Sequence, residues 1–175
     1  MTVETWDAIR GRRSVRAFAR RPVEPEHLRR ILDAGRRAPS SKNTQRWEFV
    51  LVEEREQLRR LSEVGDFAGH LAGAAAAVAL IVPDTADPSL REWLAFDAGH
   101  ASENMMLAAR DLGVGSVHAA VYDEALAREI LGLPDGWRCF VLISLGYPEG
   151  AEAFERPAIK GNRRPLDDIV HRDRW

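Results

Sequence analysis

Residues 139–145 read CFVLISL, an uninterrupted apolar run that ends at Gly146 and Pro148. A strand with one face in water alternates apolar and polar residues, whereas a strand covered on both faces carries a continuous run of this kind. We therefore predict a central strand over residues 139–145, with other elements packed on both sides of it.

The rest of the chain is predicted to supply helices and further strands around this run. Strand composition is found at residues 47–52 and 114–121, and apolar side chains at helical spacing indicate helices over residues 3–10, 24–38, 54–64, 87–112 and 123–131. The apolar run at 74–82 fits a buried strand or the end of a helix, because periodicity does not separate the two. Strands and helices without strict alternation predict an α+β fold, and the length fits one domain over residues 1–175.

Composition excludes some classes of protein. The 175 residues are 45% hydrophobic and 30% charged, with a net charge of −2, which excludes a protein whose whole surface binds nucleic acid or an acidic membrane. The longest uncharged stretch, residues 71–83, is shorter than the roughly 18 apolar residues that span a bilayer. The single cysteine, Cys139, and an N-terminus without a signal-peptide pattern predict a location in the cytoplasm.

Positive charge is concentrated near the N-terminus. Between residues 10 and 37 there are ten arginines and three acids, and the sequence RRSVRAF at residues 12–18 places three guanidiniums and a hydroxyl within five positions. The fixed N–H groups of a guanidinium match the oxygens of a phosphate or carboxylate. The pattern predicts an anion site, with a solvated basic patch as the alternative.

Other patterns do not support a catalytic centre of their own. Gly113-x-Gly115 follows a helix instead of a strand, unlike a dinucleotide-binding turn. His70, His100 and Glu103 could suggest a metal site, since His100 and Glu103 share a helix face, but no further ligands complete it. No nucleophile-elbow sequence surrounds any serine, so we name no catalytic acid, base or nucleophile.

Four segments taken together resemble the flavin-dependent nitroreductase family: RRSVRAF at 12–18, APSSKNTQRW at 38–47, residues 97–115, and LGYP at 145–148. They occur in the family's order and at its spacing. The resemblance implies an α+β fold in which helices flank a central, mainly antiparallel sheet, and an intertwined homodimer with one FMN at each of two interface sites. It also implies ping-pong chemistry: NAD(P)H reduces the flavin, and a nitroaromatic, quinone or related electron-poor acceptor then takes the electrons.

The resemblance further implies a set of cofactor-binding residues. Arg12, Arg13, Ser14 and Arg16 match the residues that hold the phosphate and ribityl chain, and either Arg163 or Arg164 matches a basic residue that returns to the phosphate. The loop residues Ser41 and Asn43, with Arg37 just before them, match residues that reach the flavin of the partner subunit. Beside the flavin ring the matching residues are His118, Ala119 and Ala120.

Two departures and several alternatives accompany this resemblance. Arg46 stands where the family usually has proline before the tryptophan, and the C-terminal tail is short. From the residues alone, Ser14 also fits a turn cap and His118 a core histidine. The alternative functions are a non-catalytic FMN sensor or carrier, and a flavoenzyme of the same fold that dehalogenates its substrate, dehydrogenates a ring or breaks down flavin. Neither nucleic acid nor a membrane is an expected partner.

Overall fold

The computed structural model describes residues 4–155 and 163–175. Its helices are α1 (Thr5–Gly11), α2 (Pro25–Arg36), α3 (Arg55–Leu61), α4 (Pro88–Asp111) and α5 (Glu124–Leu131), and its strands are β1 (Glu48–Val52), β2 (Ala76–Pro83), β3 (Gly115–Ala120) and β4 (Trp137–Gly146). Residue 3, where the first helix was predicted to begin, lies outside the described residues. The other predicted helices and strands are found within a few residues of their expected bounds.

The four strands form one antiparallel sheet in the order β1-β2-β4-β3. The prediction of a central strand is confirmed, because β4 lies between two neighbours and buries Leu142 on one face and Ile143 on the other. The ambiguous run at 74–82 forms the strand β2, whose residues 76–82 are all buried. Both inner strands therefore carry continuous apolar runs.

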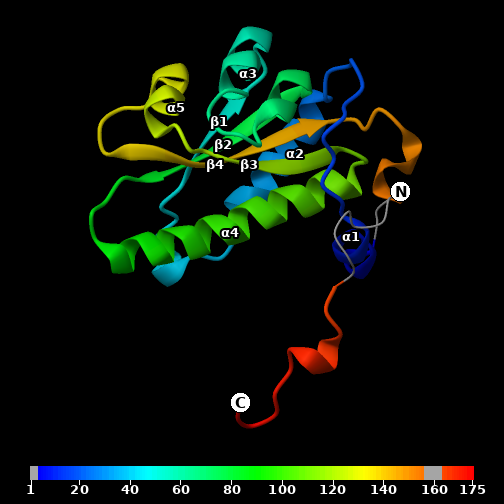
Figure 1. Ribbon diagram of the computed structural model, residues 1–175, viewed down its shortest axis with the longest axis vertical. Coiled ribbons are helices and arrows are strands. Elements are labelled where there is room, and N and C mark those ends of the chain that lie inside the picture. The colour runs from blue at the N-terminus through cyan, green and yellow to red at the C-terminus, as the bar shows by residue number, and fades with distance from the viewer. Residues whose placement is uncertain (1–3, 156–162) are drawn as a thin grey trace.

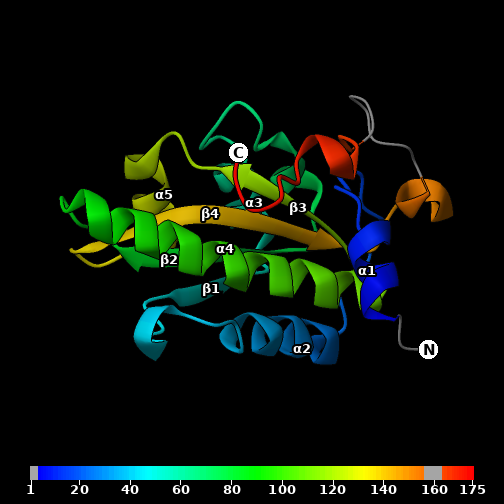
Figure 2. The ribbon, with the colours of Figure 1, turned by 90° about the horizontal axis from the view of Figure 1, so that it is seen from below.

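Helices cover both faces of the sheet (Figure 1). One face packs against α2 and α4 in a core that includes Ile31 and Met105, and the other packs against α3 and α5 in a core that includes Leu58 and Ala127. Seen from below, α4 crosses the sheet with α2 beside it (Figure 2). This arrangement confirms the predicted α+β class.

The long helix α4 follows from signals at its start and from small residues along its length. Asp87 caps it by accepting a hydrogen bond from the backbone N–H of Ser89 at 3.0 Å, and Pro88 takes the first helical position. Close contact with α2 occurs at Gly35, where an added Cβ would overlap the side chain of Met105. Glycine at this position thus allows α2 and α4 to pack closely.

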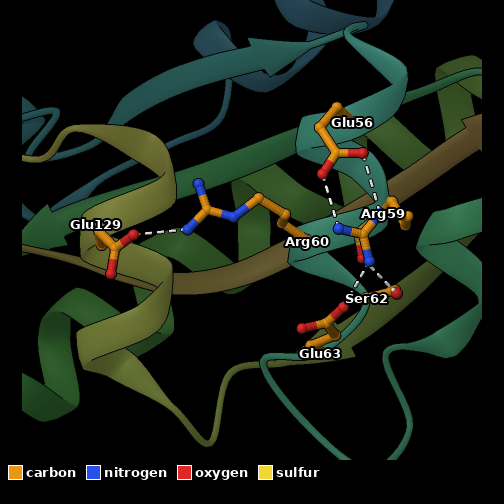
Figure 3. A network of polar contacts seen from close by, with 6 residues as sticks. All are labelled: Glu56, Arg59, Arg60, Ser62, Glu63 and Glu129. Atoms are coloured by element: carbon orange, nitrogen blue, oxygen red, sulfur yellow. Dashed lines mark hydrogen bonds and ion pairs between the residues drawn. The ribbon is translucent and has the colours of Figure 1, made fainter.

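On the opposite face, one exposed ion pair links α3 to α5 and another lies within α3 (Figure 3). Arg60 reaches Glu129 at 2.6 Å, and Arg59 reaches Glu56 at 2.7 Å. The hydrogen bond from Arg59 lowers the pKa of Glu56. Exposed pairs of this kind contribute little to stability, so the layer depends mainly on its buried apolar side chains.

Candidate functional site

The segment that follows α1 lies across the end of the sheet. Ser14 forms a parallel bridge with Ser116 at the start of β3, and Phe18 forms an antiparallel bridge with Pro148 just beyond β4. The N–H of Val15 donates to the carbonyl of Ser116 at 3.1 Å. Figure 1 shows this segment passing beside the arrowhead of β4. The arginine-rich sequence is therefore fixed by backbone hydrogen bonds.

Two glycines make this close approach possible. Gly115 and Gly146 are opposite each other in the register of β3 and β4. A Cβ on Gly115 would lie 2.7 Å from the Cβ of Val15, and a Cβ on Gly146 would lie 2.8 Å from the ring of Phe18. Any larger residue at either position would push the segment away from the sheet.

Some side chains of this segment enter the core and others face the surface. Val15 and Phe18 are buried, at 4% and 8% exposure, and pack with Val117. Ser14 and Arg16 are exposed on the other side. Burial of the apolar residues thus orients a hydroxyl and a guanidinium outward.

The two preceding arginines have partners within the chain. Nε of Arg12 donates to Oε1 of Glu103 on α4 at 3.2 Å. Nη1 of Arg13 donates to the carbonyls of Arg10 and Arg12, at 2.8 and 3.0 Å, where α1 ends. These contacts fix the two guanidiniums next to the exposed donors of Ser14 and Arg16.

Two histidines lie near the same end of the sheet. The pKa of His118 on β3 is lowered, first by desolvation and then by the charge of Arg12, while Glu103 opposes the shift. The pKa of His70 is also lowered, by burial and then by the charge of Arg16. Both histidines are therefore neutral at neutral pH.

His70 carries an unused polar atom. Its Nδ1 lies 2.8 Å from Oγ of the buried Ser144 on β4. Within the described part of the chain its Nε2 is buried and has no hydrogen-bond partner. A buried polar atom without a partner is costly, so a ligand that reached this position would gain by bonding to it.

The three residues of β3 that were predicted to lie beside the flavin ring have side chains on different faces of the sheet. His118 and Ala120 are exposed, whereas Ala119 is buried between the sheet and the helices α3 and α5. Strand alternation explains the difference. Ala119 could therefore contact a ligand only through its backbone.

The loop with Ser41 and Asn43 is attached to the middle of α4. The buried carboxylate of Asp97 accepts hydrogen bonds from the backbone N–H of Ser41, 3.1 Å from each oxygen, and from its hydroxyl at 3.2 Å. Lys42, Asn43 and Gln45 have φ of 54°, 55° and 48°. Non-glycine residues in this left-handed region cost on the order of 1 kcal/mol each or more, so other contacts must hold the loop.

Within one chain, this loop and the arginine segment are attached to α4 at different positions. The loop is attached at Asp97 and the arginine segment at Glu103, six residues further along α4. Six residues correspond to about 9 Å along the axis and about 120° around it. The two sets of donors are therefore attached at different positions along α4 and on different sides of it.

Arg37 and the tail arginines are also apart from the arginine segment. Arg37 is exposed on the end of α2, where Nε donates to Asp33 at 2.6 Å and this bond raises the pKa of Arg37. Arg37 lines an open groove of about 950 Å³ between α2 and β1, which includes Trp47 and Phe49 and none of the residues 12–18. Arg163 and Arg164 belong to the exposed tail, which projects away from the body (Figure 1).

Residues 4–155 and 163–175 give little support for a metal site, a cysteine nucleophile or a membrane-spanning helix. No group of three or more His, Cys, Asp or Glu side chains is placed to hold a metal there. Burial raises the pKa of Cys139 to about 12, so its thiol is not a reactive nucleophile at neutral pH. None of the helices in this part of the chain has the length and apolar composition of a membrane span.

Sequence reasoning missed three residues that the fold brings to these positions. His70 and Glu103 were considered only as possible metal ligands, and Asp97 was not assigned to the site. Asp97 was detectable in principle, because it interrupts an apolar stripe that includes Leu94, Ala98 and Ala101. His70 and Glu103 find their partners through tertiary contacts between distant segments, which no local pattern records.

Comparison with known proteins gives consistent matches over the whole chain. The model of the nitroreductase family matches residues 9–69 and 64–147. A protein of Archaeoglobus fulgidus named NADH dehydrogenase/NAD(P)H nitroreductase is 38% identical over 181 residues, covering 98% of this chain and 99% of its own. A crystal structure of a protein with the same name from Parabacteroides distasonis has 34% identity and a TM-score of 0.83, with 98% of both chains covered.

A third match is a structure with a nicotinamide bound. It is the NADPH:FMN oxidoreductase of Vibrio harveyi in complex with NAD+, with 27% identity and a TM-score of 0.84 over 98% of this chain and 77% of that one. The family match, the relatives and the shared fold agree with one another. The chain belongs to the nitroreductase family.

Proposed function

We propose that the protein is an FMN-dependent NAD(P)H oxidoreductase that reduces nitroaromatics, quinones or related electron-poor molecules. Membership of the nitroreductase family and the names of its relatives support an oxidoreductase. The observation that carries the assignment of FMN is the arginine segment, fixed across the sheet end with Ser14 and Arg16 exposed. A solvated basic patch would not need this backbone anchoring.

The donors near this segment fit the groups of FMN. A phosphate needs charged donors, and the outward guanidinium of Arg16 is one. The ribityl chain and the polar edge of the ring need further hydrogen bonds, for which the exposed hydroxyl of Ser14 is available. Bound FMN would supply two-electron transfer between NAD(P)H and the acceptor.

The residues of the chain would then bind and orient the reactants. Arg16 and Ser14 hold the cofactor by charge-assisted hydrogen bonds, and Glu103 keeps Arg12 in place beside them. His118 stays neutral at neutral pH and so adds no further positive charge next to Arg12. No side chain is required to act as a nucleophile.

We also propose that two copies of the chain form the sites together. The face of α4 exposes Trp93 and Phe96, at 53% and 56%, whose rings pack edge to face at 5.8 Å. The tail exposes Leu166, Ile169 and Trp175. Apolar surface of this extent favours association with a second copy, which would bring the loop with Ser41 and Asn43 to the arginine segment. A location in the cytoplasm stays a prediction.

The test is the visible absorption spectrum of the purified protein, recorded without oxygen before and after NADH or NADPH is added. We expect a flavin spectrum, in the protein as purified or after FMN is added, that bleaches with the nicotinamide and returns with a quinone. Protein that takes up no FMN would contradict the proposal. Bound flavin that neither nicotinamide reduces would favour the sensor or carrier instead.

A further inference from the structure

We propose that Asp97 is a positioning residue that holds the loop of residues 40–45 in the conformation that binds the flavin. The inference rests on the proposed function, since it concerns the loop that carries Ser41 and Asn43. Asp97 is 4% exposed, on the face of α4 that packs into the core. Its two oxygens accept both the N–H and the hydroxyl of Ser41.

The loop needs an external anchor because of its backbone. Lys42, Asn43 and Gln45 all have positive φ, a backbone conformation that residues other than glycine rarely adopt. Contacts inside the loop come from Ser40, whose Oγ accepts the N–H of Gln45 at 2.9 Å, and from Thr44, whose hydroxyl donates to the carbonyl of Ser41 at 2.9 Å. These bonds shape the loop, and the bonds of Ser41 to Asp97 attach it to α4.

The buried carboxylate of Asp97 needs the hydrogen-bond donors of Ser41, and Ser41 is held in place by the same bonds. A buried carboxylate without hydrogen-bond donors is strongly unfavourable, so the position of Asp97 favours loop conformations in which Ser41 points its N–H and hydroxyl inward. With Ser41 held inward, the exposed Asn43 two residues later has a defined direction. Asp97 therefore acts on the flavin through the loop, without contacting it.

The experiment compares variants by FMN titration and by hydrogen exchange. Asp97→Asn keeps the shape of the side chain and one carbonyl oxygen, Asp97→Ala removes all acceptors, and Ser41→Ala removes only the hydroxyl. The matched control is Asp84→Asn, an exposed carboxylate 3.7 Å from Arg91 beyond the end of β2. FMN dissociation constants are measured for these four variants, the double variant Asp97→Ala with Ser41→Ala, and the wild type, together with backbone exchange of a peptide covering residues 38–47.

We expect the FMN dissociation constant to rise about tenfold for Asp97→Asn, as expected for a lost hydrogen bond to a charged group, and further for Asp97→Ala. Ser41→Ala should have a smaller effect, and the double variant Asp97→Ala with Ser41→Ala should be less than additive. Exchange should rise in the 38–47 peptide of Asp97→Asn with the central strands unchanged. The Asp84→Asn control should stay within about twofold of the wild type for FMN binding.

An unchanged FMN affinity in Asp97→Asn, or exchange that rises equally throughout the chain, would overturn the positioning role. If the Asp97 variants do not fold, Ser41→Ala decides. FMN binding equal to that of the wild type would refute the proposal, and so would weaker binding without faster exchange in the 38–47 peptide. Weaker binding together with faster exchange in that peptide would support it. Wild-type protein that binds no FMN would instead refute the proposed function. The two failures are therefore distinguishable.

Discussion

Val15 and Arg16 illustrate how single residues create the site. Val15 is 4% exposed and enters the core, so that its neighbour Arg16 must point outward. Ser14 also points outward, and Phe18 points inward after the exposed Arg16 and Ala17. The apolar residues of the segment thus determine the direction of its charged ones, and hydrophobic burial orients the candidate anion site.

Arg16→Ala tests this role with little risk to the fold, because Arg16 is exposed. A charge-assisted hydrogen bond contributes about 1.5–3 kcal/mol, so FMN binding should weaken by roughly 10-fold to 100-fold. Riboflavin lacks the phosphate and should lose less affinity. Fluorescence titration with both ligands measures the difference, and Arg60→Ala, at the exposed ion pair with Glu129, is the control. Equal losses for the two ligands would show that Arg16 does not bind the phosphate.

His70 makes stability depend on pH. Burial and the charge of Arg16 lower its pKa in the folded chain below the value of about 6.5 in the unfolded chain. Between these two values the unfolded state binds more protons, so stability is retained above about pH 6.5 and is lost as the pH falls toward the folded-state pKa. His70→Asn should reduce, without abolishing, the loss of melting temperature between about pH 7.5 and 5.5, because the pKa of His118 is lowered as well. The same loss in wild type and variant would contradict this.

At the residue scale, the sequence predicted the candidate donors better than their contacts. The run of arginines and the loop of polar residues are local patterns, and they pointed to residues 12–18 and 38–47. The bond from Ser41 to Asp97 joins residues 56 positions apart, and Arg12 meets Glu103 across 91 positions. Pairs of this kind depend on how α4 packs, which no local pattern specifies.

At the element scale, the paired ends of β3 and β4 support the arginine segment. Gly115 and Gly146 face each other there and leave space for Val15 and Phe18. The sequence suggested only that Gly115 follows a helix and that Gly146 ends a strand. Their second role could not be predicted, because it depends on a segment about 100 residues earlier in the chain.

Gly146→Ala should therefore disturb the site from a distance. Its Cβ would lie 2.8 Å from the ring of Phe18, and overpacking of this kind costs about 1–3 kcal/mol. We expect a lower melting temperature together with weaker FMN binding, because the segment would shift. The control for both measurements is Gly73→Ala, because a Cβ added at Gly73 would have no other atom within 4 Å. A destabilised variant with full affinity for FMN would show that the anchoring is not needed for binding.

The elements themselves were mostly predictable. Helical spacing and caps located α4 and α5, and the apolar run located β4. The run at 74–82 was ambiguous because strands and helices that are buried on all sides have no polar face to reveal their period. This run forms a strand, β2, because it pairs with both β1 and β4 in the sheet.

At the scale of the whole molecule, the two sets of donors lie on different sides of α4. Arg16 belongs to the segment across the sheet end, whereas Asn43 belongs to the loop attached at Asp97. The exposed Trp93 and Phe96 on α4 offer apolar surface for a second copy. The proposed dimer, in which each flavin would be held by the arginine segment of one copy and the loop of the other, would be consistent with all three observations.

FMN binding by a mixed dimer tests this arrangement most directly. One copy carries Arg16→Ala and the other carries Asn43→Ala, and the mixed dimer is purified through two different tags. If the donors come from different copies, one site contains both substitutions and the other contains neither. We therefore expect one FMN per mixed dimer at wild-type affinity, while each parent variant binds weakly at both sites. A mixed dimer that binds FMN as weakly as its parents would contradict the account.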